Sequence, residues 1–116
     1  MRAIWNQPEG ILDWLGLCYA RTITAIKSWT YPVRTGAKVK DFAQVIYQLG
    51  RERYRFSKDG NGGCRFWVLT LLKDFVTACL IAPWAHTEML QWMEFQYYEE
   101  KEKMPKPLPI FPGTFY

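Results

Sequence analysis

A glycine-rich segment that runs directly into an apolar helical pattern is the feature that most constrains this chain. Residues 57–63 contain three glycines together with Asp59 and Asn61, a composition typical of a tight, irregular loop. From Cys64 onward, apolar side chains return at spacings that place them on one face of a helix. This face comprises Cys64, Val68, Leu71, Leu72, Phe75 and Cys79. We therefore predict a buried helix from Cys64 to about Leu80 at the centre of the fold.

The segments around this helix predict a small α+β fold with an antiparallel sheet and about three helices, one opening at Cys64. Apolar residues at helical spacing, followed by Gly50, predict a helix over residues 38–49. A further helix is expected over residues 87–103, which begin with a threonine suited to an N-cap. β-Branched and aromatic residues predict strands over residues 22–33 and 53–56.

The two ends of the chain have contrasting patterns. Residues 1–10 look like an N-terminal arm or edge strand, and the dense apolar stretch 11–20 fits either a helix or a buried strand. Residues 104–116 hold four prolines, so we expect an extended, proline-rich tail whose aromatic side chains pack on the domain. No repeat or linker divides the chain, and residues 1–116 are predicted to form a single domain.

Charge and cysteine usage narrow the classes of function. The net charge is +4, with 15 basic residues scattered among 11 acidic ones, which argues against a dedicated nucleic-acid binder. No apolar run has the length of a signal peptide or a bilayer span, so no membrane partner is expected. Cys18, Cys64 and Cys79 follow no disulfide or zinc spacing, which favours reduced thiols, a cytoplasmic location, and neither a metal nor another cofactor.

Cys64 is the candidate catalytic residue because of its expected place at the start of a helix. The positive end of the helix dipole and the free backbone N–H groups favour the thiolate, which is the nucleophilic form. Gly62 and Gly63 allow close approach, and Arg65 adds positive charge. The base would have to be His86, the only histidine, which lies beyond the far end of a helix about 25 Å long. The alternative is that Cys64 is a small buried residue at a loop-to-helix junction.

The aromatic content supports a different interpretation, a ligand cleft near Cys64. Aromatic residues make up 17% of the chain, a share that fits a core rich in rings, a ligand cleft or a partner surface. In the cleft, aromatic side chains would hold a small apolar or aromatic molecule, while glycines and an arginine contact its polar group. The predicted ligand-binding residues are Gly62, Gly63, Arg65, Phe66, Trp67 and Trp29.

Two motifs resemble an uncharacterised fungal domain family. Residues 60–68 read G-N-G-G-C-R-F-W-V, and residues 113–116 close the chain with G-T-F-Y. The similarity also takes in residues 26–32 and 39–46, so it covers most of the chain. This resemblance implies a fungal origin, and a role in fungal specialised metabolism is part of our expectation of a binding or tailoring protein.

A more distant similarity is to the permuted papain-like thiol enzymes, such as lecithin-retinol acyltransferase-like proteins and PPPDE peptidases. In these enzymes an early strand carries a histidine and a later helix opens with the nucleophilic cysteine. The resemblance implies that Cys64 is the nucleophile, but no histidine precedes it in this chain.

We therefore expect first a small-molecule binding or tailoring protein. The alternatives are a cysteine-dependent hydrolase or acyl/group transferase, and a homodimeric interaction domain.

Overall fold

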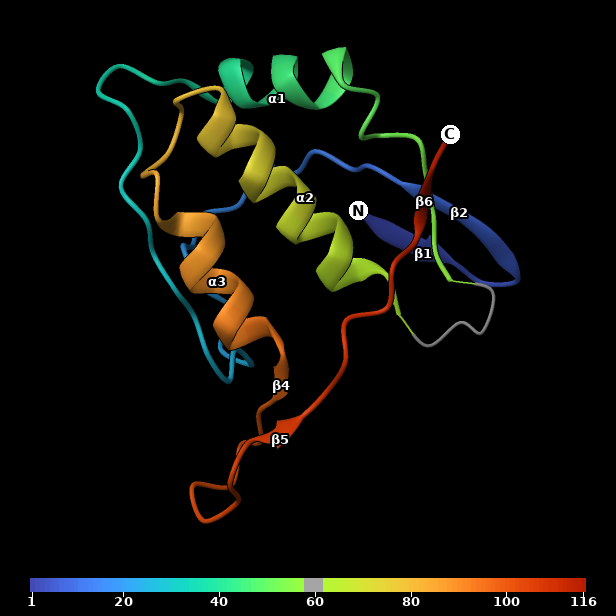
Figure 1. The fold of residues 1–116 in the computed structure, drawn as a ribbon, viewed down its shortest axis with the longest axis vertical. Coiled ribbons are helices and arrows are strands. Elements are labelled where there is room, and N and C mark those ends of the chain that lie inside the picture. The colour runs from blue at the N-terminus through green and yellow to red at the C-terminus, as the bar shows by residue number, and fades with distance from the viewer. Residues whose placement is uncertain (58–61) are drawn as a thin grey trace.

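Three helices and a small antiparallel sheet make up the part of the chain that the structure describes (Figure 1). The computed structural model describes residues 1–57 and 62–116, so most of the predicted glycine loop, residues 58–61, lies outside the described residues. The elements are β1 (Arg2–Ile4), β2 (Gln7–Ile11), α1 (Val39–Gln48), β3 (Tyr54–Arg55), α2 (Cys64–Thr77), α3 (Ala85–Met93), β4 (Phe95–Gln96), β5 (Lys106–Pro107) and β6 (Thr114–Phe115). The sheet has the strand order β1-β2-β3-β6, and β4 pairs separately with β5. The predicted α+β class is confirmed, as is the helix that opens at Cys64.

The central helix, α2, lies between α1 and α3 and packs against both (Figure 1). It starts at Cys64 because its N-cap, Gly63, has a φ of 118°, a conformation that favours glycine. Trp67 and Leu71 are buried in the main core cluster, and Leu69 is buried as well. α1 and α3 cover two sides of α2, so the buried side chains of α2 do not lie on a single face. Cys64, which the pattern placed on the buried face, is exposed.

The end of α2 also differs from the prediction. The helix stops at Thr77, three residues before the predicted end. Cys79 has a φ of 57°, and the N–H groups of Cys79 and Leu80 bond back to the last turn of the helix, as in a Schellman motif. This left-handed residue turns the chain away from the helix axis. Cys79 is therefore exposed and not part of the buried face.

The helix predicted over residues 38–49 and the strand predicted over residues 53–56 are both present. The backbone N–H of Lys38 donates to Asp41 at 2.7 Å, which satisfies a free amide at the start of α1. Gly50, with a φ of 65°, follows the helix as expected of a stop signal. β3 is then the strand that links β2 to the C-terminal strand β6.

The predicted strand over residues 22–33 is wrong. This segment contains one isolated bridge, between Val33 and Ile81, and runs as turns and extended chain. Its β-forming residues have no neighbouring strand within residues 1–57 and 62–116, and Ile23 is fully exposed. Residues 12–20 likewise form neither the helix nor the buried strand that their apolar pattern allowed, because most of their side chains face solvent.

The helix predicted over residues 87–103 is shorter and begins earlier. α3 starts at Ala85, with Trp84 as its N-cap, and ends at Met93. The chain then forms β4, which pairs with β5 in the proline-containing tail. A tertiary pairing therefore replaces the helical turns that the local pattern favoured.

The C-terminal tail runs from β5 along the start of α2 to the sheet, where β6 pairs with β3 (Figure 1). The ring of Phe115 packs on Tyr54, with the ring centroids 4.9 Å apart. The tail therefore connects the β4–β5 pair at one end of the fold with the four-stranded sheet at the other end (Figure 1). None of the helices in the two described ranges is long and apolar enough to cross a membrane.

Candidate functional site

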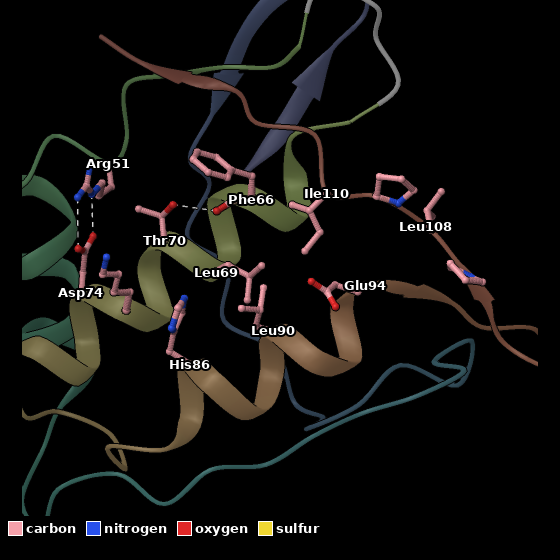
Figure 2. Close-up of a pocket in the computed structure, with 13 residues that line it drawn as sticks. Arg51, Phe66, Leu69, Thr70, Asp74, His86, Leu90, Glu94, Leu108 and Ile110 are labelled. Carbon is pink, nitrogen blue, oxygen red and sulfur yellow. Dashed lines mark hydrogen bonds and ion pairs between the residues drawn. The ribbon is translucent and has the colours of Figure 1, made fainter.

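A cavity of about 840 Å³ lies between α2, α3 and the C-terminal tail (Figure 2). Its volume falls within the range of small-molecule sites, roughly 300–1,000 Å³. Three walls surround it, one from α2, one from α3 and one from residues 107–110, while Arg51 closes one end. We call this cavity the α2–α3 cleft.

The α2 wall follows helical spacing. Phe66, Thr70 and Asp74 recur every four residues, and Leu69 and Lys73 form the neighbouring stripe. The hydroxyl of Thr70 donates to the carbonyl of Phe66 at 2.9 Å, so its hydrogen is used within the helix. The α2 wall is therefore apolar near its start and charged near its end.

The α3 wall has the same spacing. His86, Leu90 and Glu94 are four residues apart and line the cleft together. Figure 2 shows His86 and Glu94 toward opposite ends, with Leu90 between them. Since an α-helix rises 1.5 Å per residue, these two ends are about 12 Å apart along α3. The wall thus has an apolar middle and an ionisable group at each end.

The third wall is held in place by Arg65. Its guanidinium donates to the carbonyls of Met93, Leu108 and Pro109, the last two at 2.9 Å. The N–H of Leu108 also donates to the carbonyl of Glu94 at 2.7 Å. Arg65, which was predicted to contact a ligand, instead joins the tail to the end of α3.

An ion pair closes one end of the cleft. Arg51 donates to both carboxylate oxygens of Asp74, at 2.7 and 3.2 Å, a bidentate arrangement (Figure 2). The guanidinium carbon of Arg51 also lies 4.6 Å from the ring centroid of Phe115. The charges of Arg51 and Asp74 are therefore used within the protein.

Three ionisable groups in the cleft remain available. Among the described residues, the side chains of Lys73, His86 and Glu94 make no hydrogen bond or ion pair. Two of them, Lys73 and Glu94, are exposed to solvent. The cleft consequently offers a cation, an imidazole and a carboxylate to a bound molecule.

Cys64 lies at a different cavity, of about 690 Å³, formed mainly by the β1–β2 hairpin. Phe56, Ser57 and Gly62 complete its lining, and the thiol of Cys64 is exposed. The expectation of a small buried residue is therefore wrong for Cys64. His86 lines the α2–α3 cleft instead, so the structure does not bring the two residues into one site.

Gly63 and Gly113, one from each motif, pack against Tyr54. Its side chain is fully buried, and its hydroxyl donates to the carbonyl of Gly63 at 2.7 Å. A Cβ atom on Gly113 would collide with the Tyr54 ring, and one on Gly62 would lie 3.2 Å from the Cβ of Phe111. Burial raises the pKa of Tyr54, and this outweighs the opposite effect of the Gly113 backbone. These glycines have a packing role that requires no ligand.

The predicted aromatic residues lie in three places. Phe66 lines the α2–α3 cleft. Trp67 is buried in the core, where its Nε1 donates to the carbonyl of Arg51 at 2.8 Å. Trp29 stacks on Trp92, with ring centroids 6.0 Å apart. Two residues from Leu90, Trp92 points to the opposite side of α3, so Trp29 lies outside the cleft.

Several residues of the cleft were missed at the level of sequence. From the sequence, His86 is considered only as a base for Cys64, and Thr70, Lys73, Asp74 and Glu94 are given no role, although all five line the cleft. The spacing of His86, Leu90 and Glu94 is the signal that points to a shared face. Among the described residues, no group of three His, Cys, Asp or Glu side chains is arranged to hold a metal ion.

Comparisons with known proteins identify a family but give no activity. Neither the curated proteins nor the solved structures contain a match for this chain. One family model matches residues 3–116, which is nearly the whole chain. The chain therefore belongs to the family described as Domain of unknown function (DUF7770).

Proposed function

We propose that this protein binds a small, largely apolar molecule in the α2–α3 cleft. The observation that carries the proposal is the cleft itself, a cavity of about 840 Å³ with an apolar middle and ionisable groups at its ends. Leu69 and Leu90 supply apolar surface from two helices, and Ile110 faces them from the tail (Figure 2). This combination of apolar lining and a few polar groups is characteristic of ligand sites.

The proposed ligand is a specialised metabolite, and the protein acts on it by binding or by assisting its tailoring. The support for this finer statement is the resemblance of the two motifs to a fungal domain family. We place the ligand site in the α2–α3 cleft rather than at Cys64, because Phe66, one of the predicted binding residues, lines this cleft. The other predicted residues support the surrounding structure.

A thermal-shift screen with and without a blocked cleft tests this proposal. Leu90→Trp places a larger side chain in the cleft, whereas Gln91→Trp adds the same ring at an exposed position of α3 outside it. A ligand at a hundred times its dissociation constant stabilises the folded state by about 2.7 kcal/mol. We expect compounds that stabilise the wild type and Gln91→Trp but not Leu90→Trp. A stabilisation that is equal in all three proteins would contradict binding in the cleft.

A cysteine-dependent reaction at Cys64 is the second candidate function. The observation that favours it is an exposed thiol at the start of α2, lining a cavity. The chain's only histidine lies elsewhere, which weighs against a papain-like pair. Iodoacetamide labelling across pH, with Cys64→Ser and Cys18→Ser as matched variants, measures the reactivity. A rate at Cys64 no greater than at Cys18 would remove this candidate.

The third candidate function is a homodimeric interaction domain. The observation that favours it is the set of exposed apolar side chains in the irregular segment before α1. Leu15 and Ile23 are among them, at 77% and 103% exposure. Such surface favours self-association when it is contiguous. Sedimentation at several concentrations tests this reading, and a monomer at every concentration would exclude it.

A further inference from the structure

We infer that the ligand of the α2–α3 cleft is a dipolar chain molecule, with a carboxylate at one end, an ammonium at the other and an apolar middle. This inference rests on the proposed function and adds the chemical class of the ligand. It follows from where the unused charges of the cleft lie.

The end of the cleft near His86 is cationic. Arg51 and Asp74 neutralise each other there through their bidentate pair. Lys73 directly precedes Asp74 on α2 and lines the cleft, and no ion pair among the described residues uses its ammonium group. A carboxylate bound at this end gains a charge-assisted hydrogen bond from Lys73, and the imidazole of His86 offers a further polar contact.

The opposite end of the cleft is anionic. Glu94 is the C-cap of α3, and Figure 2 shows its side chain near that of Ile110. Arg65 donates to three main-chain carbonyls, among them that of Met93, and it neither lines the cleft nor forms an ion pair with Glu94. The Glu94 carboxylate is thus available to an ammonium group.

The distance between the ends sets the length of the ligand. The ends are about 12 Å apart along α3, and Leu69, Leu90 and Ile110 lie between them. An extended chain such as ω-aminooctanoate, or an apolar tripeptide, separates its charges by about 10 Å. Both have the required chemistry, and the assay distinguishes them.

The test compares probes that carry one charge or two. Binding of ω-aminooctanoate, octanoate, octylamine and trileucine is measured by calorimetry at low salt. We expect ω-aminooctanoate or trileucine to bind about fivefold more tightly than either singly charged probe, the size of one exposed ion pair. The stronger of the two identifies whether the source is an ω-amino acid or a peptide.

Charge-removing variants assign each end of the ligand. Lys73→Met should abolish the preference of the dipolar probe over octylamine, and Glu94→Gln should abolish its preference over octanoate. Lys40→Met and Glu99→Gln remove exposed charges outside the cleft and should leave both preferences unchanged. Unchanged preferences in the two cleft variants would overturn the inference.

The remaining outcomes separate this inference from the proposed function. If all probes bind equally and Leu90→Trp blocks them, the cleft is a ligand site but the dipolar class is wrong. If no probe binds, the dipolar class is overturned, and the metabolite screen with Leu90→Trp still decides whether the cleft binds other molecules.

Discussion

Replacing Arg65 with methionine should release the wall of the cleft that the tail supplies. The substitution keeps an unbranched side chain but removes three hydrogen bonds to the carbonyls of Met93, Leu108 and Pro109. A hydrogen bond from a charged group contributes about 1.5–3 kcal/mol. The carbonyls lie near the surface and water can replace part of what they lose, so we expect a total loss of about 3 kcal/mol rather than the full sum.

Urea unfolding, followed by tryptophan fluorescence, measures the loss in the free energy of unfolding. In thermal unfolding, a change of 1 kcal/mol corresponds to about 4 °C for a domain of this size, so Tm should fall by about 12 °C. Arg65→Lys keeps the charge but lacks the planar fork, and should recover about half of the lost stability. Arg21→Met is the control, because Arg21 is exposed and donates no hydrogen bond to any residue in the described ranges.

Amide hydrogen exchange distinguishes a released tail from general destabilisation. The N–H of Leu108 bonds to the carbonyl of Glu94, so its exchange should accelerate in Arg65→Met more than exchange in the core of α2. If Arg65→Met unfolds and exchanges like Arg21→Met, Arg65 does not hold the tail. The assignment of its three bonds to cleft formation would then be refuted.

Three further substitutions test the packing around the site. Asp74→Asn leaves the partly buried Arg51 without its counter-charge and should cost about 2 kcal/mol in urea unfolding. Cys79→Gly relieves a left-handed residue and should add about 0.5–1 kcal/mol to the free energy of unfolding. Tyr54→Phe leaves the carbonyl of Gly63 without its partner and should cost about 1–2 kcal/mol. The raised pKa of Tyr54 also predicts that stability falls as pH rises above about 10, because the unfolded chain loses the phenol proton first.

Each of these substitutions has an internal comparison. Glu9→Gln breaks an exposed pair with Arg55 and should cost less than Asp74→Asn. Ala78→Gly, next to Cys79 but with an ordinary φ of −78°, should destabilise rather than stabilise. Tyr54→Phe should reduce the alkaline loss of stability, although Tyr31, whose pKa is also raised by burial, keeps part of it. An opposite sign for Cys79→Gly, or an unchanged alkaline slope in Tyr54→Phe, would contradict the corresponding argument.

Glycines next to the helix ends correctly predicted where α1 stops and where α2 begins. The start of α2 follows from the glycine at position 63, and the end of α1 follows from Gly50. Where a distant partner decides the conformation, local signals failed. Residues 22–33 have strand-forming side chains, but the described part of the chain places no strand beside them. Phe95 and Gln96 leave the helical pattern because β5 pairs with them.

The cleft was less predictable than the fold because its walls are distant in the sequence. The stripe of His86, Leu90 and Glu94 is visible in the sequence, but nothing local shows that it faces α2. Arg65 illustrates a second difficulty, since its partners are main-chain carbonyls, which leave no trace in residue identity. The sequence therefore predicts a ligand contact for Arg65, whereas in the structure this side chain holds the tail.

The positions of the two family motifs relative to the cleft separate fold from ligand choice. Gly63 and Gly113, one from each motif, both contact Tyr54, so the motifs maintain the packing between the start of α2 and the tail. Lys73, His86 and Glu94, which carry the unused charges of the cleft, lie between the motifs in sequence. Changes at these three positions leave the Tyr54 contacts intact. The motifs therefore belong to the scaffold, whereas the charges that we propose to select the ligand lie between them.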